Sequence, residues 1–144
     1  MSESKPPVGV VVVTHGLLGR ELVEAARVIL GGSAELPLHA LSIGWNDPMD
    51  EAREHVEETL AVANHGSGVL ILTDMFGGTP TNLCLSFLAE GEVEIITGVN
   101  LPMVVKCMNL GRELGEGRTL REVAERVARK GSSSVVLASE MLEG

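Results

Sequence analysis

The sequence predicts an α/β domain, a three-layer sandwich in which helices cover both faces of a mostly parallel sheet. Two observations predict it. Apolar runs alternate with segments of helical periodicity, and two of these runs, Val8–Val13 and Gly68–Thr73, are continuous. Continuous apolar runs are typical of strands buried on both faces of a parallel sheet. The 144 residues fit one domain over residues 1–144, with residues 1–7 as a flexible N-terminus.

Four apolar segments are the expected parallel strands, and we expect them in the order 2-1-3-4 across the sheet. Strands that alternate with helices in this way are joined by right-handed crossovers. A short fifth strand, Ser134–Ala138, follows the last helix. The four parallel strands are Val8–Val13, Leu38–Ile43, Gly68–Thr73 and Val93–Thr97.

Helix signals lie between the strands. Thr79 can cap a helix that starts at Pro80, and Asn46-Asp47-Pro48 supplies a cap and an N1 proline for an earlier one. Thr119 and Glu122 form a capping box for the last helix. Glycines at 111, 115 and 117 mark the loop before it. The expected helices run from Leu18 to Leu30, from Pro48 to about Ala63, from Pro80 onward, from about Leu101 to about Leu110, and from Thr119 to Lys130-Gly131.

Composition excludes several classes of protein. With 20 acidic and 11 basic side chains the net charge is -9, which repels nucleic-acid backbones and anionic membranes. Aromatic residues make up 2 %, too few for stacking single-stranded bases. No apolar run approaches the roughly 20 residues that span a bilayer, and no signal segment precedes the first strand, so we expect a cytoplasmic protein. Cys84 and Cys107 lie in apolar stretches and are expected to be buried thiols.

The candidate site lies where the first and third strands end. In an open α/β sheet, ligands bind beyond the carboxyl ends of the strands at the point where strand order reverses, which in a 2-1-3-4 order lies between these two strands. They end at His15 and Asp74. An aspartate that accepts a hydrogen bond from one ring nitrogen of a histidine fixes the tautomer and leaves the other nitrogen free to act as a base, ligand or nucleophile.

The residues expected around His15 are suited to a phosphoryl group as the reacting group. Phosphoryl transfer needs positioning and charge neutralisation, and backbone N–H groups at Gly16 and in the Gly77-Gly78 turn can supply both. The hydroxyls of Thr14 and Thr79 can add donors.

Three other interpretations of these residues stay open at this point. A strand-end histidine is often only structural. A small-ligand or nucleotide-binding module of flavodoxin-like architecture would use the Gly77-Gly78 turn for a bound phosphate without covalent chemistry, although no G-x-G-x-x-G or lysine-bearing P-loop is present. A metal site on His15 and Asp74 would need a third ligand that the spacing does not supply, so we expect no metal and no cofactor. His39, His55 and His65 do not share the switch-point location and are expected to be structural or solvated.

Three segments carry a resemblance to a known family: Thr14-His15-Gly16, Asp74 to Pro80, and Gly98 to Met103. In order and spacing, from about Val8 to Ala138, the sequence resembles the IIA component of the mannose family of the bacterial phosphoenolpyruvate-dependent sugar phosphotransferase system. The resemblance implies that His15 accepts a phosphoryl group from the phosphocarrier HPr and passes it to a IIB component, with Asp74 bonded to the histidine. The resemblance further implies that this phosphoryl transfer serves either sugar uptake or a regulatory readout.

The resemblance also implies partners. It implies a homodimer in which the last strand, Ser134–Ala138, is antiparallel and exchanged between subunits. Because the chain ends at Gly144 we expect the IIB acceptor to be a separate protein, and contact with the membrane components IIC and IID only through it. Trp45 and Phe76 follow the second and third strands on the same edge as His15, where they are candidate contacts for a protein partner.

Overall fold

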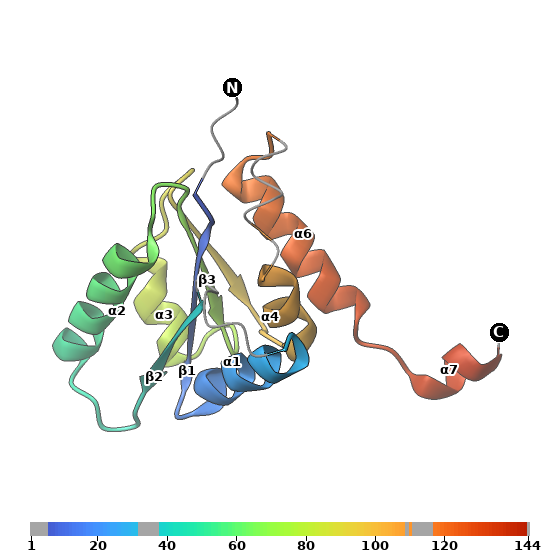
Figure 1. The fold of residues 1–144 in the computed structure, drawn as a ribbon. Coiled ribbons are helices and arrows are strands. Elements are labelled where there is room, and N and C mark those ends of the chain that lie inside the picture. The colour runs from blue at the N-terminus through green and yellow to red at the C-terminus, as the bar shows by residue number, and fades with distance from the viewer. Residues whose placement is uncertain (1–5, 32–37, 109, 111–116, 144) are drawn as a thin grey trace.

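The computed structural model describes residues 6–31, 38–108, 110 and 117–143. Its sheet has the order β2-β1-β3-β4, and each neighbouring pair is parallel, which confirms the predicted topology. Figure 1 shows the sheet between two layers of helices. The strands are β1 (Gly9–His15), β2 (Leu38–Ile43), β3 (Val69–Thr73) and β4 (Val93–Thr97).

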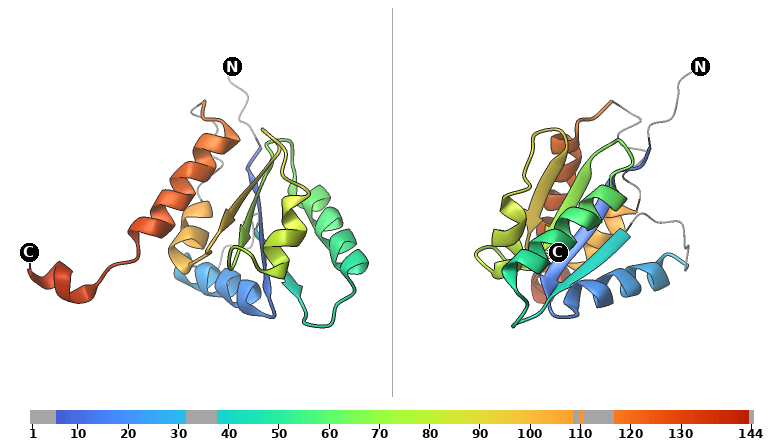
Figure 2. Two further views of the ribbon diagram at one scale, coloured as in Figure 1. Left: turned by 180° about the vertical axis from the view of Figure 1, so that it is seen from behind. Right: turned by 90° about the vertical axis from the view of Figure 1, so that its left-hand side faces the viewer.

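Helices cover both faces of the sheet, as Figure 2 shows from two further sides. One face carries α1 (Leu18–Ile29), α4 (Leu101–Cys107) and α6 (Leu120–Ser133). The other carries α2 (Met49–Ala63) and α3 (Thr79–Leu85). The three-layer sandwich is therefore confirmed for the described residues.

The alternation of side chains along β1 explains why its apolar run is unbroken. Val10 and Val12 pack into the core under α1, α4 and α6, whereas Val11 and Val13 pack into the core under α2 and α3. All four are fully buried. A central parallel strand has no solvent-facing side, so it needs apolar residues at every position.

The register of the sheet sets the position of the two candidate site residues. His15 is the last residue of β1 and pairs with Ile43, while Val13 pairs with Thr73, the last residue of β3. Asp74 comes one residue after β3, so it lies beside the end of β1 at the carboxyl edge of the sheet. This edge is the predicted switch point.

The predicted fifth strand is not formed in the single chain. Ser134 ends α6, residues 135–137 have no regular secondary structure, and α7 (Ala138–Glu143) begins where the strand was expected to end. Figures 1 and 2 show this end of the chain extending away from the body. A strand forms only beside another strand, and the segment has none within reach in its own chain.

Four helix ends differ from their predictions. α4 ends at Cys107, earlier than the expected end near Leu110. Pro48 is the N-cap of α2 instead of its first residue, and Asp47 Oδ2 accepts from the Gly44 N–H at 2.7 Å. Thr79 is the first residue of α3 and makes no cap, because Gly78 stands at the N-cap. The capping box of α6 is present as predicted, but the helix continues through Gly131 to Ser133.

Two predicted segments lie partly or wholly outside the described residues. The glycine loop at 111–117 falls there except for Gly117, and so do residues 1–5 of the N-terminus. Pro6 is described, and its carbonyl accepts a hydrogen bond from Ser67 Oγ at 2.6 Å. Among the described residues no helix is both long and apolar enough to cross a membrane.

Candidate functional site

Asp74 holds both the backbone and the side chain of His15 through hydrogen bonds to one carboxylate oxygen. The His15 backbone N–H donates to Asp74 Oδ2 at 3.0 Å, and the ring Nδ1 lies 2.7 Å from the same oxygen. The second carboxylate oxygen, Oδ1, accepts from the Met75 N–H at 3.1 Å. Since the carboxylate only accepts, the ring proton lies on Nδ1, and the Nε2 lone pair is free.

Asp74 is a permanently charged partner at neutral pH. Its side chain is 11 % exposed. Burial alone would raise the pKa of this carboxyl, but the hydrogen bonds from the backbone N–H and the ring of His15 outweigh it, so its pKa lies below its ordinary value of 3.8. A carboxylate that stays ionised beside Nδ1 stabilises positive charge on the ring.

Gly78 keeps the space beside the free ring nitrogen open. A Cβ at this position would lie 2.8 Å from His15 Cε1 and 3.5 Å from His15 Nε2. Ordinary contacts between carbon atoms begin near 3.5 Å, so a side chain here would press against the edge of the ring that carries the lone pair. The missing side chain leaves this edge accessible.

The loop that carries Gly78 is anchored by Thr81, a residue that the sequence analysis did not single out. Its Oγ1 donates to the Met75 carbonyl at 2.5 Å and lies 2.7 Å from Thr73 Oγ1, and the Thr81 side chain is fully buried. The only signal in the sequence was a polar residue one turn after the glycines. Thr81 ties the start of α3 to the end of β3 and so fixes the loop over His15.

The structure separates the predicted phosphate-binding residues into two groups. Gly16 and Gly77 lie in the loops after β1 and β3 and have φ values of 53° and 84°, which favour glycine. The predicted phosphate contact of the Gly16 N–H is wrong, because this group donates to the Ile43 carbonyl at 3.1 Å. The Thr79 side chain is exposed on the first turn of α3. Thr14, in contrast, is fully buried, and its Oγ1 accepts from the Gly19 N–H at 2.7 Å. Thr14 therefore orients the start of α1 and does not line the candidate site.

Exposed apolar side chains surround His15. The Trp45 ring lies 5.4 Å from the His15 ring between centroids, at an interplanar angle of 31°. Trp45 is nevertheless 85 % exposed, and Phe76 is 76 % exposed. Met75 and Leu17, in the loops after β3 and β1, are exposed as well. An apolar rim of Leu17, Trp45, Met75 and Phe76 around a half-buried polar centre is typical of a protein interaction site.

The remaining histidines and the cysteines take no part in this site. Burial, followed by the charges of His65 and Arg27, lowers the pKa of His39, which lies on β2. Cys84 and Cys107 are buried thiols, as predicted. The described part of the chain contains no cluster of three or more His, Cys, Asp or Glu side chains able to hold a metal ion.

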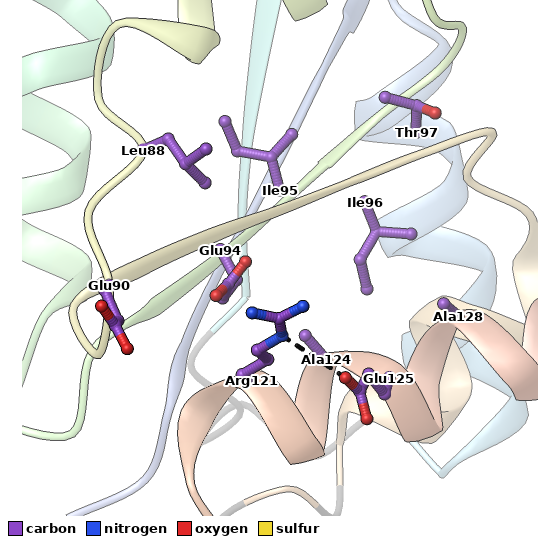
Figure 3. A pocket seen from close by; sticks show the side chains of 10 residues that line it. All are labelled: Leu88, Glu90, Glu94, Ile95, Ile96, Thr97, Arg121, Ala124, Glu125 and Ala128. Atoms are coloured by element: carbon purple, nitrogen blue, oxygen red, sulfur yellow. Dashed lines mark ion pairs between the residues drawn. The ribbon is translucent and has the colours of Figure 1, made fainter.

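Apart from the His15 site, a groove lies at the edge of the sheet, between β4 and α6. Its volume is about 700 Å³. Figure 3 shows Ile95 and Ile96 of β4 above Ala124 and Ala128 of α6, and the ion pair between Arg121 and Glu125 beside them. The β4-edge groove, as we call it, is open because β4 is the last strand of the described sheet on this side.

Comparison with known proteins identifies the family. Residues 9–128 match the family model EIIA-man, described as the PTS system fructose IIA component. The mannose-specific EIIAB component of the phosphotransferase system (PTS) of Escherichia coli K12 is 32 % identical over 107 residues, which cover 70 % of this chain and 31 % of that protein. The chain thus spans about a third of that relative. The PTS fructose-specific EIIA component of Bacillus subtilis is 28 % identical over 137 residues, 94 % of this chain and 90 % of that protein.

Solved structures share the fold. An EIIA component from Streptococcus agalactiae superposes with a TM-score of 0.77 at 19 % identity, covering 92 % of this chain and 98 % of that one. A mannose/sorbose-specific IIA subunit from Enterococcus faecalis superposes with a TM-score of 0.75 at 21 % identity, covering 92 % and 95 %. The family match, the relatives and the shared fold agree: the chain belongs to the EIIA-man family, the mannose/fructose-type IIA components of the sugar phosphotransferase system.

Proposed function

We propose that this protein is a phosphocarrier that accepts a phosphoryl group from HPr on Nε2 of His15 and passes it to a IIB component. The observation that carries the proposal is the 2.7 Å contact between His15 Nδ1 and Asp74 Oδ2, which directs the proton to one ring nitrogen and the lone pair to the other. Family membership supports the phosphotransferase role in general terms. The donor, the acceptor and the phosphorylated atom are the parts proposed here.

The transfer step follows from this geometry. The Nε2 lone pair attacks the phosphorus of the donor phosphohistidine, a new N–P bond forms, and the old N–P bond breaks with its electron pair left on the donor ring. The proton on Nδ1 stays in place, so the phosphorylated ring of His15 carries a positive charge. The Asp74 carboxylate stabilises that charge at hydrogen-bond distance. Transfer to IIB is the same step in reverse, with the acceptor as nucleophile.

The glycine loop supplies room and donors for the phosphoryl oxygens. Since a side chain at Gly78 would press on the Nε2 edge of the ring, its absence supports a phosphoryl group at this position. We propose that backbone N–H groups of Gly77, Gly78 and Thr79 bind the phosphoryl oxygens. Backbone donors that need no reorganisation are well suited to phosphoryl transfer.

Phosphorylation by purified components tests the proposal. The chain is incubated with labelled phosphoenolpyruvate, enzyme I and HPr, and acid-labile label on the chain is measured. We expect label on the wild type and on His55→Ala, a control at an exposed histidine of α2, and none on His15→Ala. Label that persists in His15→Ala would contradict the assignment. An unlabelled wild type that phosphate stabilises against heat would favour the noncovalent binding module instead.

The apolar rim is the proposed docking surface for HPr. Trp45 and Phe76 are large and exposed, Trp45 beside the His15 ring and Phe76 in the loop after Asp74, and aromatic anchors of this kind dominate the energetics of many protein interfaces. We expect Trp45→Ala combined with Phe76→Ala to raise KM for HPr with a smaller change in kcat. Val62→Ala, at an exposed residue of α2, is the matched control and should leave KM unchanged. An unaltered KM in the double variant leaves these rings only a packing role.

We propose that the chain dimerises by strand exchange at the β4-edge groove. Val135, Val136 and Leu137 are exposed in the single chain. On the outer side of β4, Val93 bridges to Ala89, and residues 94–97 have no partner strand in the described part of the chain. An extended apolar segment of a second copy would cover both, and exchange of an identical element is a low-cost route to a dimer.

Measurement of the molecular mass in solution tests the proposed strand exchange. Val135 and Val28 are 77 % and 78 % exposed in the single chain, so aspartate at either position is equally tolerated there. We expect a dimer for the wild type and for Val28→Asp, and a monomer for Val135→Asp. A monomeric wild type, or a dimer that Val135→Asp leaves intact, would contradict strand exchange.

A further inference from the structure

The Trp45 ring lies against the ring of His15 at the carboxyl edge of the sheet. The two ring centroids are 5.4 Å apart, and the ring planes are inclined by 31°, closer to parallel than to edge-on. This indole is the single tryptophan of the chain, which has no tyrosine and two phenylalanines. Since Trp45 is largely exposed, it contributes little to the core, and its place directly against the reacting ring needs a further explanation.

A short turn after β2 holds Trp45 in this place. His15 pairs with Ile43, the last residue of β2, so the turn that follows β2 begins beside the end of β1. Asp47 Oδ2 accepts from the Gly44 N–H at 2.7 Å, and the Asp47 N–H donates to the Gly44 carbonyl at 3.3 Å. A Cβ at Gly44 would crowd the Asp47 carboxylate at 2.8 Å from Oδ1. Trp45 lies between the two bonded residues, so its backbone is fixed before any partner binds.

Three neighbours surround the His15 ring, each at a different part of it. Asp74 Oδ2 contacts Nδ1 at 2.7 Å, and Gly78, which has no side chain, lies beside Cε1 and Nε2. Trp45 supplies the ring contact. A group bonded to Nε2 lies in the plane of the imidazole ring, so a phosphoryl group would extend toward the loop of Gly78 and not between the two rings. Trp45 can therefore stay against the ring in the phosphorylated state.

The charge of the His15 ring changes in the proposed transfer. When the N–P bond forms at Nε2, the proton stays on Nδ1 and the ring becomes positive. The face of an indole attracts a cation that lies within about 6 Å of its ring centroid, and among the aromatic side chains indole attracts cations best. The His15 ring lies within that distance of Trp45. Because the neutral ring gains much less from the same contact, Trp45 favours the phosphorylated ring over the unphosphorylated one.

We propose that Trp45 is a positioning residue that stabilises the phosphorylated ring of His15 through its π face. This inference rests on the proposed phosphocarrier function and adds to it a residue that shifts the transfer equilibrium toward the phosphorylated chain. Docking and stabilisation differ in a measurable way. A residue that only contacts HPr changes forward and reverse transfer equally and leaves the equilibrium constant unchanged, whereas a residue that stabilises the phosphohistidine changes that constant.

The partition of a labelled phosphoryl group between HPr and the chain tests the proposal. Labelled phospho-HPr, freed of enzyme I, is mixed with the chain in dilute solution, and the label on each protein is measured once its distribution is constant. Trp45→Leu keeps an apolar side chain at this exposed position but removes the π face, and Trp45→Phe restores an aromatic face. Phe76→Leu is the matched comparison, because Phe76 belongs to the same apolar rim, whereas the ring contact of His15 is with Trp45.

We expect Trp45→Leu to shift the equilibrium constant about 2- to 5-fold toward phospho-HPr, the size of an exposed cation–π contact, and Trp45→Phe to shift it less. Phe76→Leu should raise KM for HPr without shifting the constant. Tryptophan fluorescence, which arises from Trp45 alone, should change when the wild type is phosphorylated. Equal constants for wild type and Trp45→Leu, an equal shift in Phe76→Leu, or unchanged fluorescence would overturn this inference alone. A wild type that takes up no label would overturn the phosphocarrier proposal as well.

Discussion

Replacing Gly78 by alanine is expected to impair phosphoryl transfer without unfolding the protein. The backbone at Gly78 has φ -82° and ψ 164°, a conformation that alanine adopts freely. The added Cβ would lie 2.8 Å from His15 Cε1 and 3.1 Å from Met75 Cγ. The substitution therefore acts on the side chains that meet this Cβ, chiefly the reacting ring, and not on the course of the chain.

The expected magnitude follows from how far the ring must move. Restoring an ordinary carbon contact of about 3.5 Å requires a displacement approaching 1 Å or a rotation of the ring. A side chain held about 30° from its preferred rotamer costs about 0.5–1.5 kcal/mol, and a misplacement of about 1 Å in a reacting group can cost about 100-fold in rate. We expect transfer from HPr to fall by about 10- to 100-fold.

Gly77→Ala is the matched comparison because it should strain the backbone without contacting the His15 ring, whereas Gly78→Ala should contact the ring without straining the backbone. Gly77 has φ 84°, and a Cβ there meets nothing within 4 Å. Alanine at this position is strained in the backbone by about 1–2 kcal/mol and should lower the free energy of unfolding. Transfer rates and urea unfolding are measured on both variants. Wild-type transfer by Gly78→Ala would refute the inference that the space beside Nε2 is used.

Four further predictions follow from single contacts. Asp74→Asn keeps the acceptor for the His15 ring but removes its charge, so transfer should slow by about 10- to 150-fold, the equivalent of about 1.5–3 kcal/mol, as measured with HPr as donor. Because the pKa of Asp74 is lowered in the fold, its ionised form stabilises the protein above pH 3.8, and this contribution is lost as the pH falls further. The difference in unfolding free energy between wild type and Asp74→Asn should therefore narrow below pH 3.8, as measured by urea titrations. Gly131→Ala should destabilise by about 1–3 kcal/mol although alanine favours helices, since its Cβ would lie 2.5 Å from Met103 Cγ, and in a thermal-melt cycle it should cost less when combined with Met103→Ala. Burial raises the pKa of the Cys84 thiol to about 12, so a colorimetric disulfide reagent should label it only on unfolding, and rapid labelling of the native protein would contradict its burial.

The layers and the site edge could be predicted because their signals are local and redundant. Continuous apolar runs marked β1 and β3 as central strands, and the rule for parallel sheets then brought His15 and Asp74 together without any contact being visible in the sequence. The hydrogen bonds from both the backbone and the ring of His15 to one Asp74 oxygen confirm that juxtaposition.

The roles of the threonines could not be predicted because they depend on which way each side chain faces. Thr14 and Thr79 both lie within two residues of a glycine, yet Thr14 is buried and bonded to the Gly19 N–H, and Gly78 takes the cap position expected of Thr79. Thr81, two residues further on, anchors the loop instead. A one-residue shift in a helix start changes the direction of a side chain by about 100°, which sequence patterns do not resolve.

The C-terminal segment differed from its prediction for a physical reason of another kind. The apolar residues at 135–138, two of them the β-branched Val135 and Val136, favour a strand. A strand needs a neighbouring backbone, however, and the described part of the single chain places none beside this segment. The local sequence carries the strand propensity, whereas the partner strand would come from a second copy in the proposed dimer.

The most direct test of the central claim is the identity of the phosphorylated atom. The chain, labelled with ¹⁵N in its histidine rings, is phosphorylated through HPr, and two-dimensional proton–nitrogen NMR assigns the modified nitrogen. The structure predicts a phosphoryl group on Nε2 of His15 with a proton retained on Nδ1 beside Asp74. A phosphoryl group on Nδ1, or on a residue other than His15, would contradict the account.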